Sequence, residues 1–312
     1  MDTVLMGVTF SFTAVHGDES VLVTALDKGI KEVIRVEKLI SSWDENSQTS
    51  SINKSAGIKP VVVDDELYSL IERSIKISKL TNGYFDISFG SIDKIWNFTE
   101  EGTIDIPSDS AINKSLTKIG YDKIVLDAKA RSVYLPKEGM KIGFGGIGKG
   151  YVANRVMLLM KSLGIESGVI NAGGDLISWG SKPNRKPWKI GIPNPKKKTE
   201  MLSWLDITDM AVVTSGNYEK FVDINGERYC HIINPKTGWP VKGIASVTII
   251  CSDAELADAL ATSVFVLGKA DGMKLINHLN GVECFIVDSN NGLSFSNNLK
   301  TKYIISNENS EY

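Results

Sequence analysis

The sequence predicts an α+β protein, because segments with a helical rhythm and segments typical of strands intermix without regular βαβ alternation. The 312 residues are 42% hydrophobic and 23% charged, which is ordinary for a globular protein with a sizeable core. The chain has no internal repeat of about 20 to 50 residues and no Pro/Ser-rich linker. We therefore expect a single domain over residues 1–305 and a loose tail over residues 306–312.

The first half of the chain predicts helices and strands around an aromatic segment. The expected elements, in chain order, are a strand over residues 4–15, a helix over 20–40, a polar loop over 41–57, a helix over 65–80, a helical segment over 107–119 and a hairpin over 121–136 with its turn at 127–129. Residues 84–98 are dense in aromatic side chains, which usually belong to a core but also suit stacking against a ring. Both interpretations stay open from the residues alone.

The second half predicts more strands and two helices. The expected elements are a strand, a glycine loop and a helix over residues 140–164, a strand over 165–171 that ends in the turn NAGGD, strands within 188–195, 204–218 and 220–238 with a hairpin turn at 224–227, helices over 252–268 and 272–279, and a hairpin over 282–296.

Net charge and cysteine content exclude several classes of function. With a net charge of −2 and a pI near 6.0, the chain has no basic field for a nucleic acid, and we expect no nucleic-acid partner. The cysteines, Cys230, Cys251 and Cys284, have no CxxC spacing, so they predict neither a disulfide framework nor a zinc site.

The hydropathy pattern predicts no membrane-spanning segment. No stretch approaches the roughly 18 apolar residues of a transmembrane helix, and the N-terminal residues lack the pattern of a leader peptide. The chain as written is therefore expected to be soluble and cytoplasmic. The alternative is a periplasmic lipoprotein anchored to the membrane, if a leader was trimmed from the sequence.

The helix expected over residues 252–268 carries two oxygen-bearing side chains on one face. Asp258 and Thr262 are four residues apart, so they lie one turn apart among Ala, Leu and Val. Mg²⁺ prefers such hard oxygen ligands together with substrate phosphates, which makes this helix a candidate for half of a metal site. In the alternative interpretation Asp258 is solvated and Thr262 bonds to its own helix.

The glycine loop GFGGIGKG, residues 143–150, partly fits two phosphate-binding motifs. Gly143, Gly145 and Gly148 match a dinucleotide fingerprint, whereas Gly150 stands where a P-loop needs Ser or Thr. Both motifs are incomplete, but each depends on backbone amides and a helix N-terminus that favour an anion. The alternative is a set of tight packing turns.

A histidine lies at the end of a predicted strand, in the segment YCHIINPKTG. His231 precedes a turn set by Pro235 and Gly238. A lone histidine is often structural, yet its pKa, ordinarily about 6.5, suits a general base that activates a hydroxyl.

Eight collinear stretches together resemble the ApbE family of FAD:protein FMN transferases. They are MGVTF from Met6, SSWDENS around Trp43, GYFDISFG from Gly83, GFGGIGKGY, NAGGD, TSGNY, HIINPKTG and ADALAT. The resemblance implies one ApbE-like, T-fold-like domain with mixed, mostly antiparallel sheets and flanking helices. It also implies Mg²⁺-dependent cleavage of FAD, transfer of FMN to a Ser or Thr hydroxyl of an acceptor protein, and release of AMP. The acceptor would be a protein such as a redox-pump subunit or a reductase domain.

The resemblance also assigns roles to individual residues. Asp258 and Thr262 match side-chain ligands of Mg²⁺, the carbonyl of Gly146 completes the protein's share of ligands, and Ala261 is adjacent. His231 matches the proposed base. The positions matched to flavin-nucleotide contacts are Met6, Trp43, Tyr84, Phe85, Asp86, Gly143, Lys149 and Ile232.

Three positions depart from the family's pattern. The family usually has Asp where this chain has Gly143 and Asn234, and Ser where it has Cys230. Because Gly143 has no carboxylate, we expect the nucleotide to bind more weakly or in a different orientation. A FAD pyrophosphatase and a non-catalytic FAD-binding protein remain as alternatives. The glycine loop alone also leaves open an NAD(P)- or ATP-dependent enzyme.

Overall fold

The computed structural model describes residues 1–96, 98, 106–193, 201–218, 221–224, 227–299 and 305–306. The chain forms two compact units. Unit 1 consists of Met1–Arg35, Gly148–Gly216 and Gly243–Tyr312, and unit 2 of Val36–Ile147 and Asn217–Lys242. The single domain expected over residues 1–305 stays a prediction, and Ser306 is the only residue of the expected tail within the described part of the chain.

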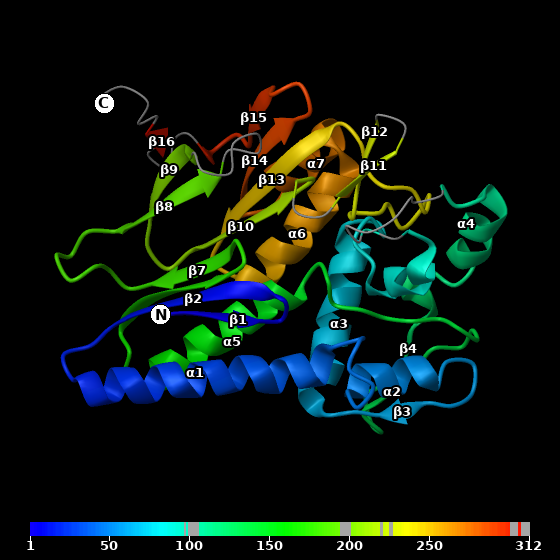
Figure 1. Cartoon of the computed structure of the whole chain (residues 1–312), viewed down its shortest axis with the longest axis horizontal. Helices are drawn as coiled ribbons and strands as arrows, with labels where there is room; N and C mark the ends of the chain where they lie inside the picture. The colour runs from blue at the N-terminus through cyan, green and yellow to red at the C-terminus, as the bar shows by residue number, and fades with distance from the viewer. Residues whose placement is uncertain are drawn as a thin grey trace. The chain divides into compact units, whose positions relative to one another are not determined.

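Unit 1 is built on an eight-stranded sheet in the order β1-β2-β6-β7-β10-β13-β14-β15, in which the strand pairings are antiparallel (Figure 1). The strands of this sheet are β1 Asp2–Leu5, β2 Val8–Val15, β6 Ser167–Ala172, β7 Asp175–Trp179, β10 Ala211–Gly216, β13 Ile244–Cys251, β14 Glu283–Asp288 and β15 Leu293–Phe295. A smaller sheet contains β8 Trp188–Pro193, β9 Met201–Ile207 and β16 Ile305–Ser306.

Helices cover one face of this large sheet. They are α1 Glu19–Ile40, whose last residues belong to unit 2, α5 Gly148–Ser162, α6 Ala254–Leu267 and α7 Lys269–Asn277. Helix α5 contacts β6 and β7, and α6 contacts β10 and β13. Side chains of Met160 on α5 and Phe12 on β2 approach Gly29, so that this glycine lets α1 pack closely.

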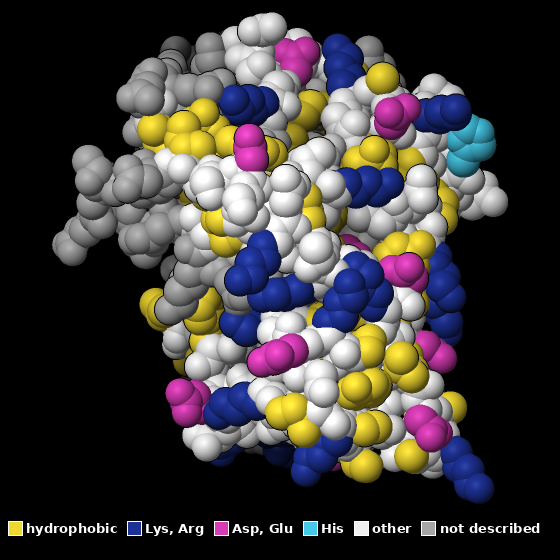
Figure 2. Space-filling model, turned by 90° about the vertical axis from the view of Figure 1, so that its right-hand side faces the viewer, with side chains coloured by type: hydrophobic (Ala, Val, Ile, Leu, Met, Phe, Trp, Pro, Cys, Tyr) yellow, Lys and Arg dark blue, Asp and Glu magenta, His cyan; other side chains and the backbone are white. Residues whose placement is uncertain are grey.

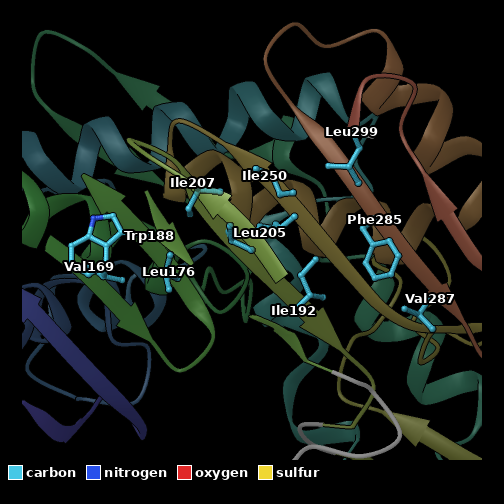
Figure 3. Packing of buried hydrophobic residues seen from close by; sticks show 11 residues of the cluster. Val169, Leu176, Trp188, Ile192, Leu205, Ile207, Ile250, Phe285, Val287 and Leu299 are labelled. Carbon is cyan, nitrogen blue, oxygen red and sulfur yellow. The ribbon is translucent and has the colours of Figure 1, made fainter. Parts of the chain in front are cut away.

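The β8–β9 hairpin covers the opposite face. Its Trp188, Ile192, Leu205 and Ile207 pack in one buried hydrophobic cluster with alternate residues of the large sheet (Figure 3). The sheet residues in this cluster are Val169, Leu176, Val212, Ile250, Phe285 and Val287. Because successive side chains of a strand point to opposite faces, the remaining buried residues of these strands face the helices. The sheet is therefore buried on both faces, which explains its nearly continuous apolar strands.

Unit 2 combines short helices with two small sheets. Its elements are α2 Gln48–Lys54, β3 Val61–Val62, α3 Asp65–Leu80, the 3₁₀ helix η1 Ile87–Ile95, α4 Asp109–Leu116, the 3₁₀ helix η2 Tyr121–Lys123, β4 Val125–Asp127, β5 Ser132–Tyr134, β11 Phe221–Ile224 and β12 Glu227–Cys230. Strands β3, β5 and β4 form one antiparallel sheet, and β11 and β12 form the other.

The aromatic segment over residues 84–98 supplies part of the unit 2 core. Trp96 is buried in a cluster with Ile112, Ile119, Tyr229 and Ile233. Its ring stacks on Tyr229 with centroids 5.7 Å apart, and its indole N–H donates a hydrogen bond of 2.9 Å to the carbonyl of Gly238. Trp96 therefore belongs to the core, as one of the two interpretations of this segment expected.

The predicted α+β class is confirmed, and helices 20–40 and 65–80 lie within one residue of their expected bounds. Three expectations were wrong. Residues 4–15 form two strands rather than one, because Met6 (φ 51°) and Gly7 (φ 74°) adopt the left-handed turn of a hairpin.

The two other errors concern the polar loop and the glycine loop. The expected loop over residues 41–57 contains α2, which begins where the hydroxyl of Ser47 accepts a hydrogen bond from the amide of Ser50. The strand expected before the glycine loop does not form, and residues 140–147 are irregular. Short polar helices and short apolar loop segments both lack the periodicity that would identify them. The turn at 225–226 lies outside the described residues, although Ile224 and Glu227 pair as the expected hairpin requires.

The surface mixes charges of both signs. On the face in Figure 2, Lys and Arg side chains gather across the middle with Asp and Glu side chains between them, and hydrophobic side chains form small groups. Among the described residues, no helix combines the length and the apolar character needed to cross a lipid bilayer.

Candidate functional site

Within unit 1, the N-terminus of α5 lies directly against α6. The closest approach is at Gly150, where a side-chain carbon in place of the hydrogen would lie 2.0 Å from the carbonyl oxygen of Ala254. Asn154, one turn later, donates to the Asp253 carboxylate and accepts from the amide of Ala254, each at 3.0 Å. Asp253 caps α6 by accepting from the amide of Leu256. These contacts fix the start of α6 on the start of α5.

This contact places Asp258 at the N-terminus of α5. Asp258 is 3% exposed, and its Oδ2 accepts a hydrogen bond of 3.0 Å from the amide of Gly150. Thr262 follows one turn later and is half-buried, whereas Ala261 is fully buried. A buried carboxylate is costly unless it is paired or hydrogen-bonded, and a helix N-terminus is a favourable place for it.

A second buried carboxylate contacts the same helix end. Asp175, at the start of β7, is 1% exposed, and its Oδ2 lies 3.0 Å from Nζ of Lys149. The side chain of Lys149 is 23% exposed to solvent. Consecutive residues of α5, Lys149 and Gly150, are thus held by carboxylates from two different elements. We call Lys149, Gly150, Asp175 and Asp258 the α5-terminus cluster.

The turn NAGGD brings the β1–β2 hairpin towards this cluster. Gly173 (φ 62°) follows β6 and donates its amide to the carbonyl of Thr9 at 3.0 Å. A side chain at Gly173 would lie 2.8 Å from Val8, which comes two residues after Met6. Since Asp175 ends the same turn, Met6 and the α5-terminus cluster lie at the same end of the sheet.

The oxygen donors on α6 suit a magnesium ion. Asp258 offers a buried carboxylate and Thr262 a hydroxyl, and Mg²⁺ commonly takes one or two protein carboxylates together with substrate phosphates. In the described part of the chain, no group of three or more His, Cys, Asp or Glu side chains could hold a metal by itself. The remaining ligands would have to come from backbone, water or substrate.

Within unit 2, the segment Tyr84–Asp86 is mostly anchored in the interior. Phe85 is 4% exposed, and Tyr84 is half-buried. The Asp86 carboxylate accepts from the amide and hydroxyl of Ser88 and from the amide of Tyr121, at 2.6 to 2.8 Å. Burial raises the pKa of Asp86 above its ordinary value, although these hydrogen bonds oppose the change. Asp86 therefore links η1 to η2.

His231 opens a tight hairpin in unit 2. Ile232, which is buried, accepts from the amide of Val241. Asn234 accepts from the amide of Lys236 through its side chain and from the amide of Gly238 through its carbonyl. His231 itself is half-buried. The hairpin thus holds the histidine at its base, where a proton acceptor has access to solvent.

Two lysines of this hairpin region lie over tyrosine rings. Nζ of Lys236 is 4.1 Å from the ring centroid of Tyr84, and Nζ of Lys242 is 4.7 Å from that of Tyr229. These cation–π contacts bring the hairpin of His231 beside the segment that carries Tyr84.

The start of the glycine loop also belongs to unit 2. The amide of Gly143 donates to the carbonyl of Ile87 at 2.9 Å, next to the Tyr84–Asp86 segment. Among the described residues, only Ser42 would lie within 4 Å of a side-chain carbon at Gly143, at 3.7 Å, so this part of the fold leaves room for a larger residue. Ser42 precedes Trp43, which is 80% exposed. Gly143 and Trp43 therefore lie on neighbouring segments.

The site residues expected from the sequence gather in two sets. Met6, Lys149, Asp258, Ala261 and Thr262 belong to unit 1. The unit 2 set is Trp43, Tyr84, Phe85, Asp86, Gly143, Gly146, His231 and Ile232. Within their own units, the members of each set lie on segments that contact one another. The glycine loop passes from unit 2 to unit 1 between Ile147 and Gly148.

Sequence reasoning missed two residues of the α5-terminus cluster. In the sequence, Asp175 stands out only as part of the turn NAGGD, and Gly150 only as the residue that breaks the P-loop motif. An acidic residue that directly follows a glycine turn at the start of an apolar strand was the available signal for Asp175. Gly150 gave no comparable signal, because a close approach between two helices is a property of the folded chain.

Comparison with known proteins agrees with this architecture. The model of the ApbE family matches residues 6–286. A FAD:protein FMN transferase from Treponema pallidum is 31% identical over 278 residues, covering 84% of this chain and 76% of the relative.

Solved structures give the same result. The crystal structure of the ApbE protein from Thermotoga maritima has a TM-score of 0.89 and 32% identity, covering 96% of this chain and 97% of that one. The flavin transferase ApbE from Vibrio cholerae shares the fold, with a TM-score of 0.85 at 24% identity, over 96% of this chain and 97% of that one. The α+β fold built on antiparallel sheets is therefore that of the ApbE proteins. The chain belongs to the ApbE family.

Proposed function

We propose that this protein is a FAD:protein FMN transferase that moves FMN from FAD to a Ser or Thr hydroxyl of an acceptor protein and releases AMP. Family membership and the relatives named FAD:protein FMN transferase support this activity. FAD is the substrate in this proposal, and the second substrate is a protein.

The α5-terminus cluster is the observation on which the proposal depends most. A diphosphate needs positive charge and backbone amides, and the start of α5 supplies Lys149 and a helix N-terminus. Beside them Asp258 and Thr262 would hold Mg²⁺, with Gly146 as a further proposed ligand through its carbonyl and Ala261 adjacent. Bound there, Mg²⁺ would supply Lewis-acid neutralisation of phosphate charge. Phosphoryl transfer requires mainly this positioning and neutralisation from a protein.

The remaining assignments concern the flavin and the proton. Met6, Trp43, Tyr84, Phe85, Asp86, Gly143 and Ile232 are proposed flavin-nucleotide contacts. We assign His231 as the base that accepts the proton of the acceptor hydroxyl. The hydroxyl oxygen forms a bond to the phosphorus of the FMN half, the bond to the AMP phosphate breaks, and AMP leaves.

A single assay tests the proposal and separates its rivals. The protein is incubated with FAD, MgCl₂ and a peptide that contains acceptor Ser and Thr residues. We expect AMP in solution and a peptide whose mass has increased by one FMN group. Equal amounts of free FMN and AMP with an unmodified peptide would indicate a FAD pyrophosphatase. Bound FAD that stays intact would indicate a binding protein without turnover.

A protein acceptor follows from the proposed activity, whereas a redox-pump subunit or reductase domain as acceptor is a proposal that needs a candidate peptide. The cytoplasmic location expected from the sequence stays a prediction.

A further inference from the structure

Asp175 is a buried carboxylate to which the resemblance assigned no role. It lies at the start of β7, directly after the Gly173–Gly174 turn, and it is 1% exposed. Its Oδ2 lies 3.0 Å from Nζ of Lys149, which is the second residue of α5. Asp175 therefore contacts the side chain that offers positive charge at this helix end.

Neither charge of this pair is placed where it would be favourable alone. A lysine in the first turn of a helix is opposed by the positive end of the helix dipole. A carboxylate that is withdrawn from water loses much of its favourable solvation. The pair offsets both costs, and it does so where the lysine side chain still keeps 23% of its exposure. A purely structural ion pair has no need to leave its cation within reach of a ligand.

The surrounding contacts make the position of the pair definite. Gly150, the residue after Lys149, donates its amide to Asp258 at 3.0 Å. The NAGGD turn is fixed from within, because the amide of Gly174 donates to the side chain of Asn171 at 2.8 Å. The backbone on both sides of the Lys149–Asp175 contact is thus held by hydrogen bonds.

We propose that Asp175 is a positioning residue that holds the Lys149 ammonium beside the N-terminus of α5, where it binds the phosphates of FAD. This inference rests on the proposed function. Lys has a flexible four-carbon stem with high rotamer entropy, so an unrestrained ammonium would have to be ordered in each turnover. A buried partner orders it in advance, which is the property that makes electrostatic groups effective in catalysis.

A double-mutant cycle tests this role. Asp175→Asn, Lys149→Met and the double variant are compared with the wild-type protein for FAD affinity and for kcat and KM, with MgCl₂ and acceptor peptide present. We expect Asp175→Asn alone to lower kcat/KM for FAD by roughly 10- to 100-fold, which is the range of coupling between residues in contact. In the Lys149→Met background the same change should have almost no effect, because its target is already gone.

Glu283→Gln is the matched control. Glu283 is also a buried acid of the large sheet, at 2% exposure, and its carboxylate accepts from the hydroxyl of Ser296. It lies on β14, which is not adjacent to β7. Loss of the Glu283 carboxylate should lower the melting temperature without changing FAD affinity, kcat or KM. If Asp175→Asn melts below the assay temperature, Asp175→Glu takes its place and should show a smaller loss that also disappears in the Lys149→Met background.

The outcomes separate this inference from the function on which it rests. Two results would overturn the role of Asp175 alone. One is a double variant whose decrease in kcat/KM is the product of the decreases in the two single variants. The other is an Asp175→Asn protein with unchanged affinity, kcat and KM. A wild-type protein that neither binds FAD nor releases AMP would overturn the proposed function and this inference with it.

Discussion

The α5-terminus cluster of unit 1 and the Tyr84–Asp86 segment of unit 2 both hold a buried carboxylate, but they use it differently. Asp86 accepts hydrogen bonds from three neighbouring groups of Ser88 and Tyr121 and so fastens two short helices together. Asp175 faces an ammonium, and Asp258 faces a helix N-terminus with a half-buried hydroxyl one turn away.

The difference concerns what remains available to a ligand. The hydrogen bonds of Asp86 serve local structure, so the loss of this side chain should lower stability even when no FAD is present. Lys149 and Thr262 keep part of their exposure beside the buried acids of unit 1. Burial of an acid therefore does not by itself indicate a site, and we base the proposed site on buried acids that lie beside a partly exposed cation or hydroxyl.

The largest effect is expected for Asp258→Ala. The variant should lose Mg²⁺-dependent release of AMP from FAD, by roughly 10³-fold or more, because phosphate charge is no longer neutralised by a bound ion. AMP release is measured by chromatography over a range of MgCl₂ concentrations. Asp253→Ala, on the same helix, is the control, and it should lose about 1 kcal/mol of stability as a lost helix cap but keep turnover. Unchanged AMP release from Asp258→Ala would remove the metal site from α6.

His231→Ala should impair transfer to the acceptor by about 10² to 10⁴-fold, the usual contribution of a general base. FAD affinity should stay unchanged, since the imidazole acts on the hydroxyl. Peptide labelling and FAD fluorescence titration measure the two quantities, with exposed His278→Ala as the control. An unaltered labelling rate would exclude His231 as the base.

Gly150→Ala tests the packing that supports the α5-terminus cluster. The added methyl would lie 2.0 Å from the carbonyl oxygen of Ala254, so the helices must move apart. We expect a loss of about 3 kcal/mol in the free energy of unfolding, the upper part of the usual range for overpacking. Gly145→Ala should be close to neutral, because no atom of the described part of the chain lies within 4 Å of the added carbon. Equal urea midpoints for the two variants would contradict the close approach of α5 to α6.

Asp86→Ala sharpens the contrast between the two regions. The loss of the Asp86 carboxylate leaves the buried amide of Ser88 and the half-buried amide of Tyr121 without their acceptor, and we expect it to cost about 2 kcal/mol in urea unfolding. The exposed neighbour Asp122→Ala should have little effect. If Asp86→Ala left the urea midpoint unchanged, these hydrogen bonds would not support the structure, and the contrast between the two regions would be lost.

The smallest effect is expected for Glu32→Gln, which lies outside both regions. Hydrogen bonds from Arg35, helped by Arg155, hold the pKa of Glu32 below its ordinary value of 4.5. A lowered pKa means that this contribution is present above pH 4.5 and is lost as the pH falls through the folded-state value. The variant should be less stable than the wild type by about 0.5 kcal/mol at pH 7, and the difference should disappear once the pH is below the lowered pKa of Glu32. Asp27→Asn, from the exposed pair with Lys31, should show almost no difference at either pH.

Local patterns identified much of this protein before any coordinates. The apolar periodicity of α1 and α3, the helix expected over residues 252–268, which contains α6, and the NAGGD turn were all readable, because each depends on neighbours in the sequence. The family followed from the order of several such motifs, since a collinear series is far more specific than any one of them.

Only the tertiary structure decided which charged residues of these motifs lie together at the start of α5. The pairing of Lys149 with Asp175 joins a helix to a strand, and the contact of Gly150 with Ala254 joins two helices more than a hundred residues apart. No local propensity encodes such contacts, because they arise when the apolar faces of α5 and α6 pack on one sheet. The sequence by itself thus determined most of the elements and the family, and tertiary packing decided which acids serve structure and which surround the start of α5.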